Sequence, residues 1–86
     1  MDGYTLNIPT TGVQTWRRES HGCVIEAMTV DGVRLARLSV CRNQVVDGNV
    51  ISVMRFAQTE ADADVVAADI ASRWPAIMAA TFEVQP

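Results

Sequence analysis

Two short phrases, Val30-Asp31-Gly32 and Val46-Asp47-Gly48, each stand between runs rich in β-branched residues. Aspartate and glycine tolerate the positive φ angles of a type I′ turn, so Asp-Gly between such runs favours a β-hairpin. The first phrase is expected to join residues 23–30 to residues 33–42. The second is expected to join that region to residues 50–57 through a loop of about three residues that includes Asn49. Two hairpins in series predict an antiparallel β-meander.

The register of the first hairpin follows if only Asp31 and Gly32 lie at its tip. Glu26 is then opposite Arg37, which places an acid against a base across the two strands. Because side chains alternate between the two faces of a strand, the residues of one face form the expected core: Cys23, Ile25, Ala27, Ala36, Leu38 and Val40, joined by Met54 and Phe56 from the next strand.

The other face of this sheet is unusually apolar for a surface that meets water. Around the charged side chains of Glu26, Arg37 and Arg55 it carries Val24, Met28, Val30, Val33, Leu35, Ile51 and Val53. We expect this second apolar face to be closed by the N-terminal strands, by residues 75–86, by a second copy of the chain or by a partner.

The N-terminal segment reads as two further strands. Residues 4–8 alternate apolar and polar and stop at Pro9, which is typical of an edge strand. Residues 13–18 form a weaker candidate with Trp16 as the main apolar anchor, followed by the breaker cluster 19–22. With the hairpins, this predicts a sheet of about four to five strands.

A helix is predicted to begin after Thr59, which suits the N-cap position. It is expected to end near Trp74, because the residue before a proline avoids the α region. A short further turn of helix over residues 75–80 and a last strand over residues 81–84 are also expected. One side of the helix is apolar, formed by Ala63, Val66, Ala67, Ile70 and Trp74. The fold class is therefore α+β, a meander with one amphipathic C-terminal helix packed on one face, in a single domain over residues 1–86.

The acidic residues gather in the C-terminal third of the chain. Residues 1–56 carry six arginines and five acids, a net charge of +1, whereas residues 57–86 carry five acids and one arginine, a net charge of −4. Carboxylates in a first helical turn complement the positive end of the helix dipole. If they have a role beyond folding, we expect Asp62, Asp64 and Asp69 to form an exposed acidic surface offered to a basic partner.

The patterns that could indicate a metal site or catalysis are incomplete. The row Glu60, Asp62, Asp64 resembles the start of an EF-hand loop, but the sixth and twelfth positions are Val65 and Ala71 where glycine and glutamate are needed. Two cysteines and one histidine are too few for a structural zinc. Ser20, His21 and Cys23 stand close together without an orienting group. We expect no enzyme activity, no cofactor and no metal.

The remaining class is a binding protein. The expected partner surface combines the second apolar face with the acidic helix residues: Met28, Val33, Leu35, Arg37, Ile51, Val53, Asp62, Asp64 and Asp69. In size and build the chain resembles the small acidic inhibitors and regulators of phages and mobile elements, including anti-CRISPR and anti-restriction proteins. The second apolar face favours a protein partner, which could also be a second copy of the chain in a homodimer. The alternative is a nucleic-acid-binding regulator that uses Trp16, Arg17 and Arg18 on its sheet, although the net charge of −3 opposes a phosphate backbone.

The start of the chain shows neither a basic n-region nor an apolar h-region, and no apolar run approaches the roughly 20 residues that span a bilayer. We therefore expect a cytoplasmic protein without a membrane partner.

Overall fold

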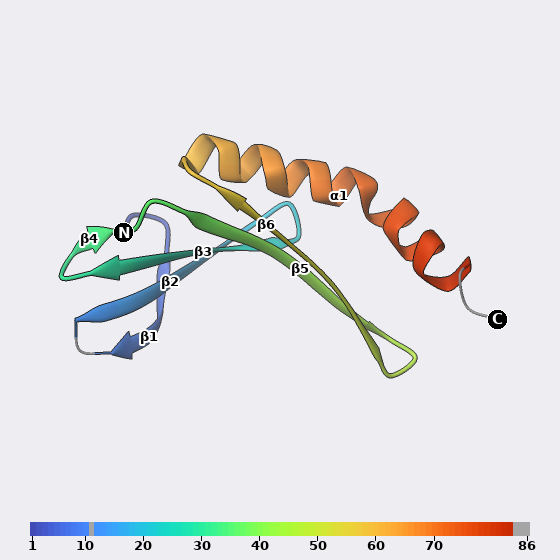
Figure 1. Ribbon diagram of the computed structural model, residues 1–86, viewed down its shortest axis with the longest axis horizontal. Coiled ribbons are helices and arrows are strands. Elements are labelled where there is room, and N and C mark those ends of the chain that lie inside the picture. The colour runs from blue at the N-terminus through green and yellow to red at the C-terminus, as the bar shows by residue number, and fades with distance from the viewer. Residues whose placement is uncertain (11, 84–86) are drawn as a thin grey trace.

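The computed structural model describes residues 1–10 and 12–83, over which it holds six strands and one helix (Figure 1). The N-terminal strands are β1 (Thr5–Thr10) and β2 (Val13–Ser20). They are followed by β3 (Cys23–Val30) and the two-residue strand β4 (Val33–Arg34). The last strands are β5 (Leu38–Val46) and β6 (Asn49–Ala57), and the helix is α1 (Glu60–Glu83).

All strands belong to one antiparallel sheet in the order β1-β2-β3-β5-β6, and β4 pairs with the end of β3. Consecutive strands are therefore neighbours, as in a meander. α1 runs along one side of this sheet (Figure 1). The predicted fold class, an α+β meander with one C-terminal helix on one face, is confirmed.

Both Asp-Gly phrases form two-residue turns with positive φ angles at both residues. The φ angles are 50° and 82° at Asp31 and Gly32, and 50° and 78° at Asp47 and Gly48. These are the signs of a type I′ turn, whose twist matches that of the flanking strands. A similar turn at His21 and Gly22, with φ angles of 49° and 76°, falls within the predicted breaker cluster and joins β2 to β3.

The register of the first hairpin is confirmed only near its tip, where Val30 pairs with Val33. Beyond β4 the chain leaves the ladder for three residues, and it returns with Ile25 opposite Val40 and Glu26 opposite Ser39. The predicted Glu26–Arg37 pair is therefore wrong. A shift of two residues preserves the alternation of faces, so Leu38 and Val40 are still buried, but Ala36, predicted as core, is exposed.

The second hairpin differs from the prediction by one residue, and this difference exchanges the faces of β6. The turn consists of Asp47 and Gly48 alone, and Asn49 pairs with Val46. Because side chains alternate, a change of one residue in the loop sends every side chain of the strand to the other face. Ile51 and Val53 consequently pack toward the helix, whereas Met54 and Phe56, predicted as core, are 60% and 52% exposed.

The start of the helix is as predicted, since the hydroxyl of Thr59 accepts a hydrogen bond from the amide of Asp62 at 3.1 Å. The predicted end at Trp74 is wrong, because α1 continues through Pro75 to Glu83. Proline removes one backbone hydrogen bond from a helix interior. The turns after it offset this loss by packing, since Ile77 and Met78 rest against the core. The strand predicted over residues 81–84 is helical over residues 81–83, and Val84 lies outside the described residues.

The core lies between α1 and one face of the sheet, which we call the helix face. Its buried residues are Cys23, Ile25, Ala27, Leu38, Val40, Ile51 and Ala57 from the sheet and Ala63, Ala67, Ile70 and Trp74 from the helix. β1 and β2 extend the sheet instead of folding over its second face. Within the described residues, therefore, neither the N-terminal strands nor residues 75–83 cover the second apolar face.

Candidate functional site

The face of the sheet opposite α1, which we call the open face, is apolar over much of its area. Alternation of side chains places there the apolar residues Val24, Met28, Val30, Val33, Leu35, Cys41, Val45, Val50, Met54 and Phe56 and the polar residues Thr15, Arg17, Glu19, Glu26, Ser39, Asn43 and Ser52. Met28 and Leu35 are 41% and 43% exposed. Several exposed apolar side chains gathered on one face are typical of an interaction site.

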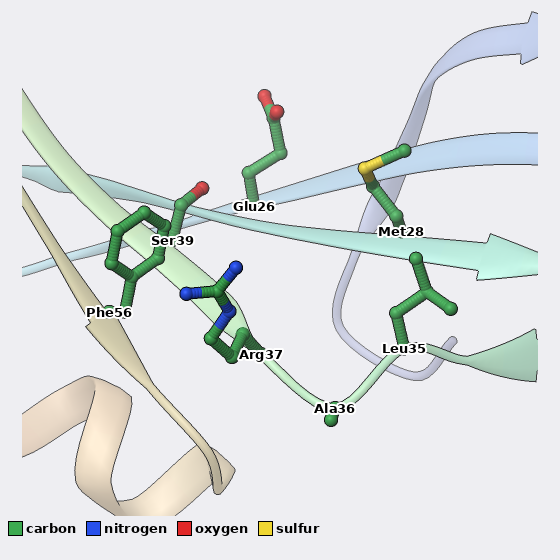
Figure 2. Close-up of a pocket in the computed structure, with 7 residues that line it drawn as sticks. All are labelled: Glu26, Met28, Leu35, Ala36, Arg37, Ser39 and Phe56. Carbon is green, nitrogen blue, oxygen red and sulfur yellow. The ribbon is translucent and has the colours of Figure 1, made fainter.

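A pocket of about 370 Å³ opens on this face, between β3 and the end of β6 (Figure 2). We call it the Arg37 pocket, and its lining residues are Glu26, Met28, Leu35, Ala36, Arg37, Ser39 and Phe56. Figure 2 shows Arg37 and Phe56 at one end of the pocket and Met28 and Leu35 at the other. An apolar recess with a charged group at its rim is the usual form of a recognition site.

The irregular segment between β4 and β5 builds one wall of the pocket, and hydrogen bonds to backbone carbonyls hold it in place. The amide of Leu35 donates to the carbonyl oxygen of Met28 at 2.9 Å. The guanidinium of Arg34 donates to the carbonyl oxygen of Leu35 at 3.0 Å and to that of Gln58 at 3.3 Å. The pocket therefore exists because the chain leaves the ladder here.

The charge of the pocket comes from Arg37. Its guanidinium carbon lies 4.7 Å from the centroid of the Phe56 ring, a cation–π distance. Glu26, the nearby acid of the lining, already forms an ion pair with Arg17 at 3.0 Å. Within residues 1–10 and 12–83, Arg37 forms no salt bridge. The pocket thus presents an unneutralised cation beside apolar side chains.

The predicted partner residues divide into two groups. Met28, Leu35 and Arg37 line one pocket, and Val33 is 68% exposed on the same face. Ile51 is only 8% exposed and Val53 packs against the same core, so the prediction that they lie on the second apolar face is wrong. Sequence reasoning missed Phe56 and Met54. A strict two-residue turn at Asp47-Gly48, as assumed for Asp31-Gly32, would have placed both outward.

Two of the three predicted acidic residues of α1 form ion pairs with arginines of the same chain. Asp64 forms an ion pair with Arg18 at 2.7 Å, and Asp69 forms pairs with Arg55 and Arg73, both at 2.9 Å. Asp62 alone of the three predicted acids has no ion pair within the described residues. The surface predicted for a basic partner is therefore largely neutralised by arginines.

The N-terminal end of α1 is tied to the first two strands by a polar cluster. Arg18, only 18% exposed, contacts Glu60 at 3.0 Å and Asp64 at 2.7 Å, and the hydroxyl of Ser20 donates to Asp64 at 2.7 Å. These hydrogen bonds, from Arg18 first and then Ser20, hold the pKa of Asp64 below its usual value. Burial, together with the hydrogen bond to Glu60, raises the pKa of the Tyr4 phenol.

Asp64→Asn is expected to lower the free energy of unfolding at pH 7 by about 1 kcal/mol, the upper range for exposed ion pairs. Because the pKa of Asp64 is lower in the folded chain, its carboxylate stabilises the fold above the unfolded pKa, and this contribution disappears as the pH falls through the folded pKa. Urea unfolding of the variant and the parent should therefore converge in acid. An equal difference at pH 7 and pH 2 would contradict the linkage, and Asp62→Asn serves as the control without an ion pair.

The three residues of the nucleic-acid alternative do not all lie on one face of the sheet. Trp16 lies on the helix face, where its Nε1 donates to the hydroxyl of Thr29 at 2.9 Å. Arg18 lies on the same face within the polar cluster, and Arg17 lies on the open face paired with Glu26. Both arginines are neutralised, so the three residues form no joint platform for bases and phosphates.

In the cluster of Ser20, His21 and Cys23, the serine hydroxyl also contacts Asp64 and the cysteine is buried. Ser20 has one hydroxyl proton and donates it to Asp64, so its 2.9 Å contact with Nδ1 of His21 needs the ring to be the donor. Cys23 is fully buried, and its burial raises the pKa of the thiol, which opposes formation of the thiolate. Over the described chain, no group of three or more histidine, cysteine or acidic residues is placed to hold a metal ion.

Comparison of the chain with known proteins gave no match to a protein-family model, to a curated protein or to a solved structure.

Proposed function

We propose that this protein is a non-enzymatic binding module that occupies a surface of another protein through its open face. The observation that carries the proposal is the Arg37 pocket, an apolar recess with one unneutralised guanidinium on a sheet face that no described part of the chain covers. The helix face already supplies the core. The open face therefore contributes little to the fold, and its apolar residues are free to serve binding.

The charge of the pocket specifies the kind of partner. A guanidinium at the rim favours a carboxylate, and the walls formed by Met28, Leu35 and Phe56 favour an apolar side chain. We propose that the partner presents an apolar residue next to an acidic residue or a C-terminal carboxylate. This differs from the surface expected from the sequence, where the acids of α1 were to meet a basic partner. An inhibitor or regulator of the kind that phages and mobile elements encode would act by such occupation.

Affinity capture from cells of the native source, read out by mass spectrometry, tests the proposal. Leu35→Asp is expected to reduce the captured partner at least tenfold, since it places a carboxylate inside an apolar pocket whose partner is itself acidic. Val45→Asp is the matched control, because Val45 is 67% exposed on the same face, at the turn end of the β5–β6 hairpin, and does not line the pocket. Equal capture by both variants would contradict the proposal.

Replacing Arg37 and measuring the salt dependence of binding distinguishes a protein partner from a nucleic-acid ligand. Arg37→Ala should weaken partner capture. Capture by the unmodified chain should fall only slightly as salt rises, because a single ion pair is involved. A nucleic-acid ligand would instead show a steep loss of affinity as salt rises.

Within the described residues no helix is long and apolar enough to cross a membrane.

A further inference from the structure

The two edges of the sheet are built differently. β1 has six residues, contains Pro9, which has no amide to donate, and shifts register between Leu6 and Ile8. β6 has nine residues, no proline and an unbroken register with β5. Its one charged residue, Arg55, bonds to Asp69 of α1. Proline, bulges and unpaired edge charges are devices that prevent strand pairing, and β6 has neither proline nor a bulge, while its one charge is paired with Asp69.

The turn before β6 determines which of its backbone groups point outward. In a two-residue turn the amide of Asn49 donates back to Val46 of β5. Both backbone groups of a residue point to the same side, and the side alternates along an antiparallel strand. The amides and carbonyls of Val50, Ser52, Met54 and Phe56 therefore face away from β5, and no strand among residues 1–10 and 12–83 receives them.

We infer that this edge pairs antiparallel with the β6 edge of a second copy of the chain. Pairing over the full length of Asn49–Ala57 centres on Val53, so that Phe56 lies opposite Val50 of the second copy and Met54 opposite its Ser52. Arg55 then lies opposite Ile51, and no like charges meet. This register brings the outward backbone groups of the two strands against each other and places the exposed apolar side chains side by side.

The symmetry of this pairing joins the two open faces. Two antiparallel strands are related by a two-fold axis perpendicular to their sheet, so both helices lie on one side of the combined sheet and both open faces on the other. Each Arg37 pocket is lined by Phe56 from the strand at the new interface. The dimer would present two pockets on one continuous surface, which would suit a partner that carries two copies of its binding segment.

The small contact predicts a weak dimer, which must be measured over a range of protein concentrations. A nine-residue strand spans about 30 Å, and a contact along one strand edge falls at the low end of specific interfaces. The dimer should therefore dissociate on dilution. In sedimentation of the purified chain, the mass is expected to rise from 9.4 kDa to twice that value as the concentration increases from micromolar to millimolar.

Amide exchange in the unmodified chain tests the geometry directly. The amides of Ile51, Val53, Arg55 and Ala57 face β5 and should be protected at every concentration. Those of Val50, Ser52, Met54 and Phe56 should gain at least tenfold protection at the concentrations where the mass doubles. A constant mass of 9.4 kDa overturns the inference. A dimer that leaves the outward amides unprotected overturns it too, because the copies then associate elsewhere.

A variant pair separates the edge contact from folding. Ser52→Pro removes an outward amide and should leave a monomer at all concentrations, whereas Ser52→Ala retains the amide and should dimerise. Both lose the hydroxyl that donates to Asn43, so that contact is matched. Dimerisation of a folded Ser52→Pro variant would contradict the inference. Because Ser52 does not line the Arg37 pocket, capture of a partner by the monomeric variant would uphold the proposed function while showing that one copy suffices.

Discussion

Ile51→Asp is expected to prevent folding, whereas Met54→Asp, three residues further along the same strand, is expected to leave the chain folded. Ile51 is 8% exposed and belongs to the core beneath α1, while Met54 is 60% exposed on the open face. A carboxylate buried without a partner, together with the lost apolar contacts, costs about 3 kcal/mol or more. That is a large share of the stability of so small a domain.

Far-UV circular dichroism and urea unfolding of the two variants provide the measurement. Ile51→Val is the control, since it retains an apolar side chain and should lower the free energy of unfolding by about 1 kcal/mol. The opposite order, with Met54→Asp unfolded and Ile51→Asp stable, would mean that the loop before β6 has three residues and that the faces of the strand are exchanged.

Trp74→Ala is expected to produce the second large effect, a loss of about 3–5 kcal/mol in the free energy of unfolding. Trp74 is 5% exposed, its Nε1 donates to the side chain of Gln44 at 2.7 Å, and the Arg42 guanidinium carbon lies 4.6 Å from the ring centroid. The indole therefore joins α1 to β5. Removing it leaves a cavity, an unpaired amide oxygen and a cation without its aromatic partner.

Trp74→Phe separates these contributions. It retains an aromatic ring beneath Arg42 and loses only the indole hydrogen bond and part of the volume, so the expected loss is about 1–2 kcal/mol. Urea unfolding followed by circular dichroism avoids the change in fluorescence that both variants cause. A loss for Trp74→Ala no greater than that for Trp74→Phe would show that the indole does not hold the helix to the sheet.

The fold could be predicted from the sequence because its determinants are local. The positions of the Asp-Gly turns, the alternation within β3 and the cap at Thr59 each depend on a few neighbouring residues, and they agree with the structure, although the loop at Asp47-Gly48 is one residue shorter than predicted. The predicted helix end at Trp74 failed because tertiary packing of Ile77 and Met78 offsets the cost of Pro75, which no local pattern reveals.

The site was only partly predictable, because it depends on how many residues leave the ladder. Residues 35–37 leave the ladder after β4 and form the pocket wall, and the side chains of β5 keep the faces predicted for them. The loop before β6 is one residue shorter than predicted, so every side chain of β6 lies on the face opposite to the predicted one. Hence Met28, Leu35 and Arg37 lie on the open face, whereas Ile51 and Val53 lie on the helix face and Phe56, predicted as core, lies on the open face. The ion pairs of Asp64 with Arg18 and of Asp69 with Arg55 join distant segments and have no signal in the sequence.

Site-specific photocrosslinking in the native cell tests most directly whether the open face is the binding surface. Benzoylphenylalanine at Phe56, which is 52% exposed at the Arg37 pocket, is expected to give an adduct with a protein partner, whose mass distinguishes it from an adduct with a second 9.4 kDa copy of the chain. The same probe at Ala76, on the exposed side of α1, is expected to give none above background. A partner adduct from Ala76 with none from Phe56 would contradict the account and place binding on the helix.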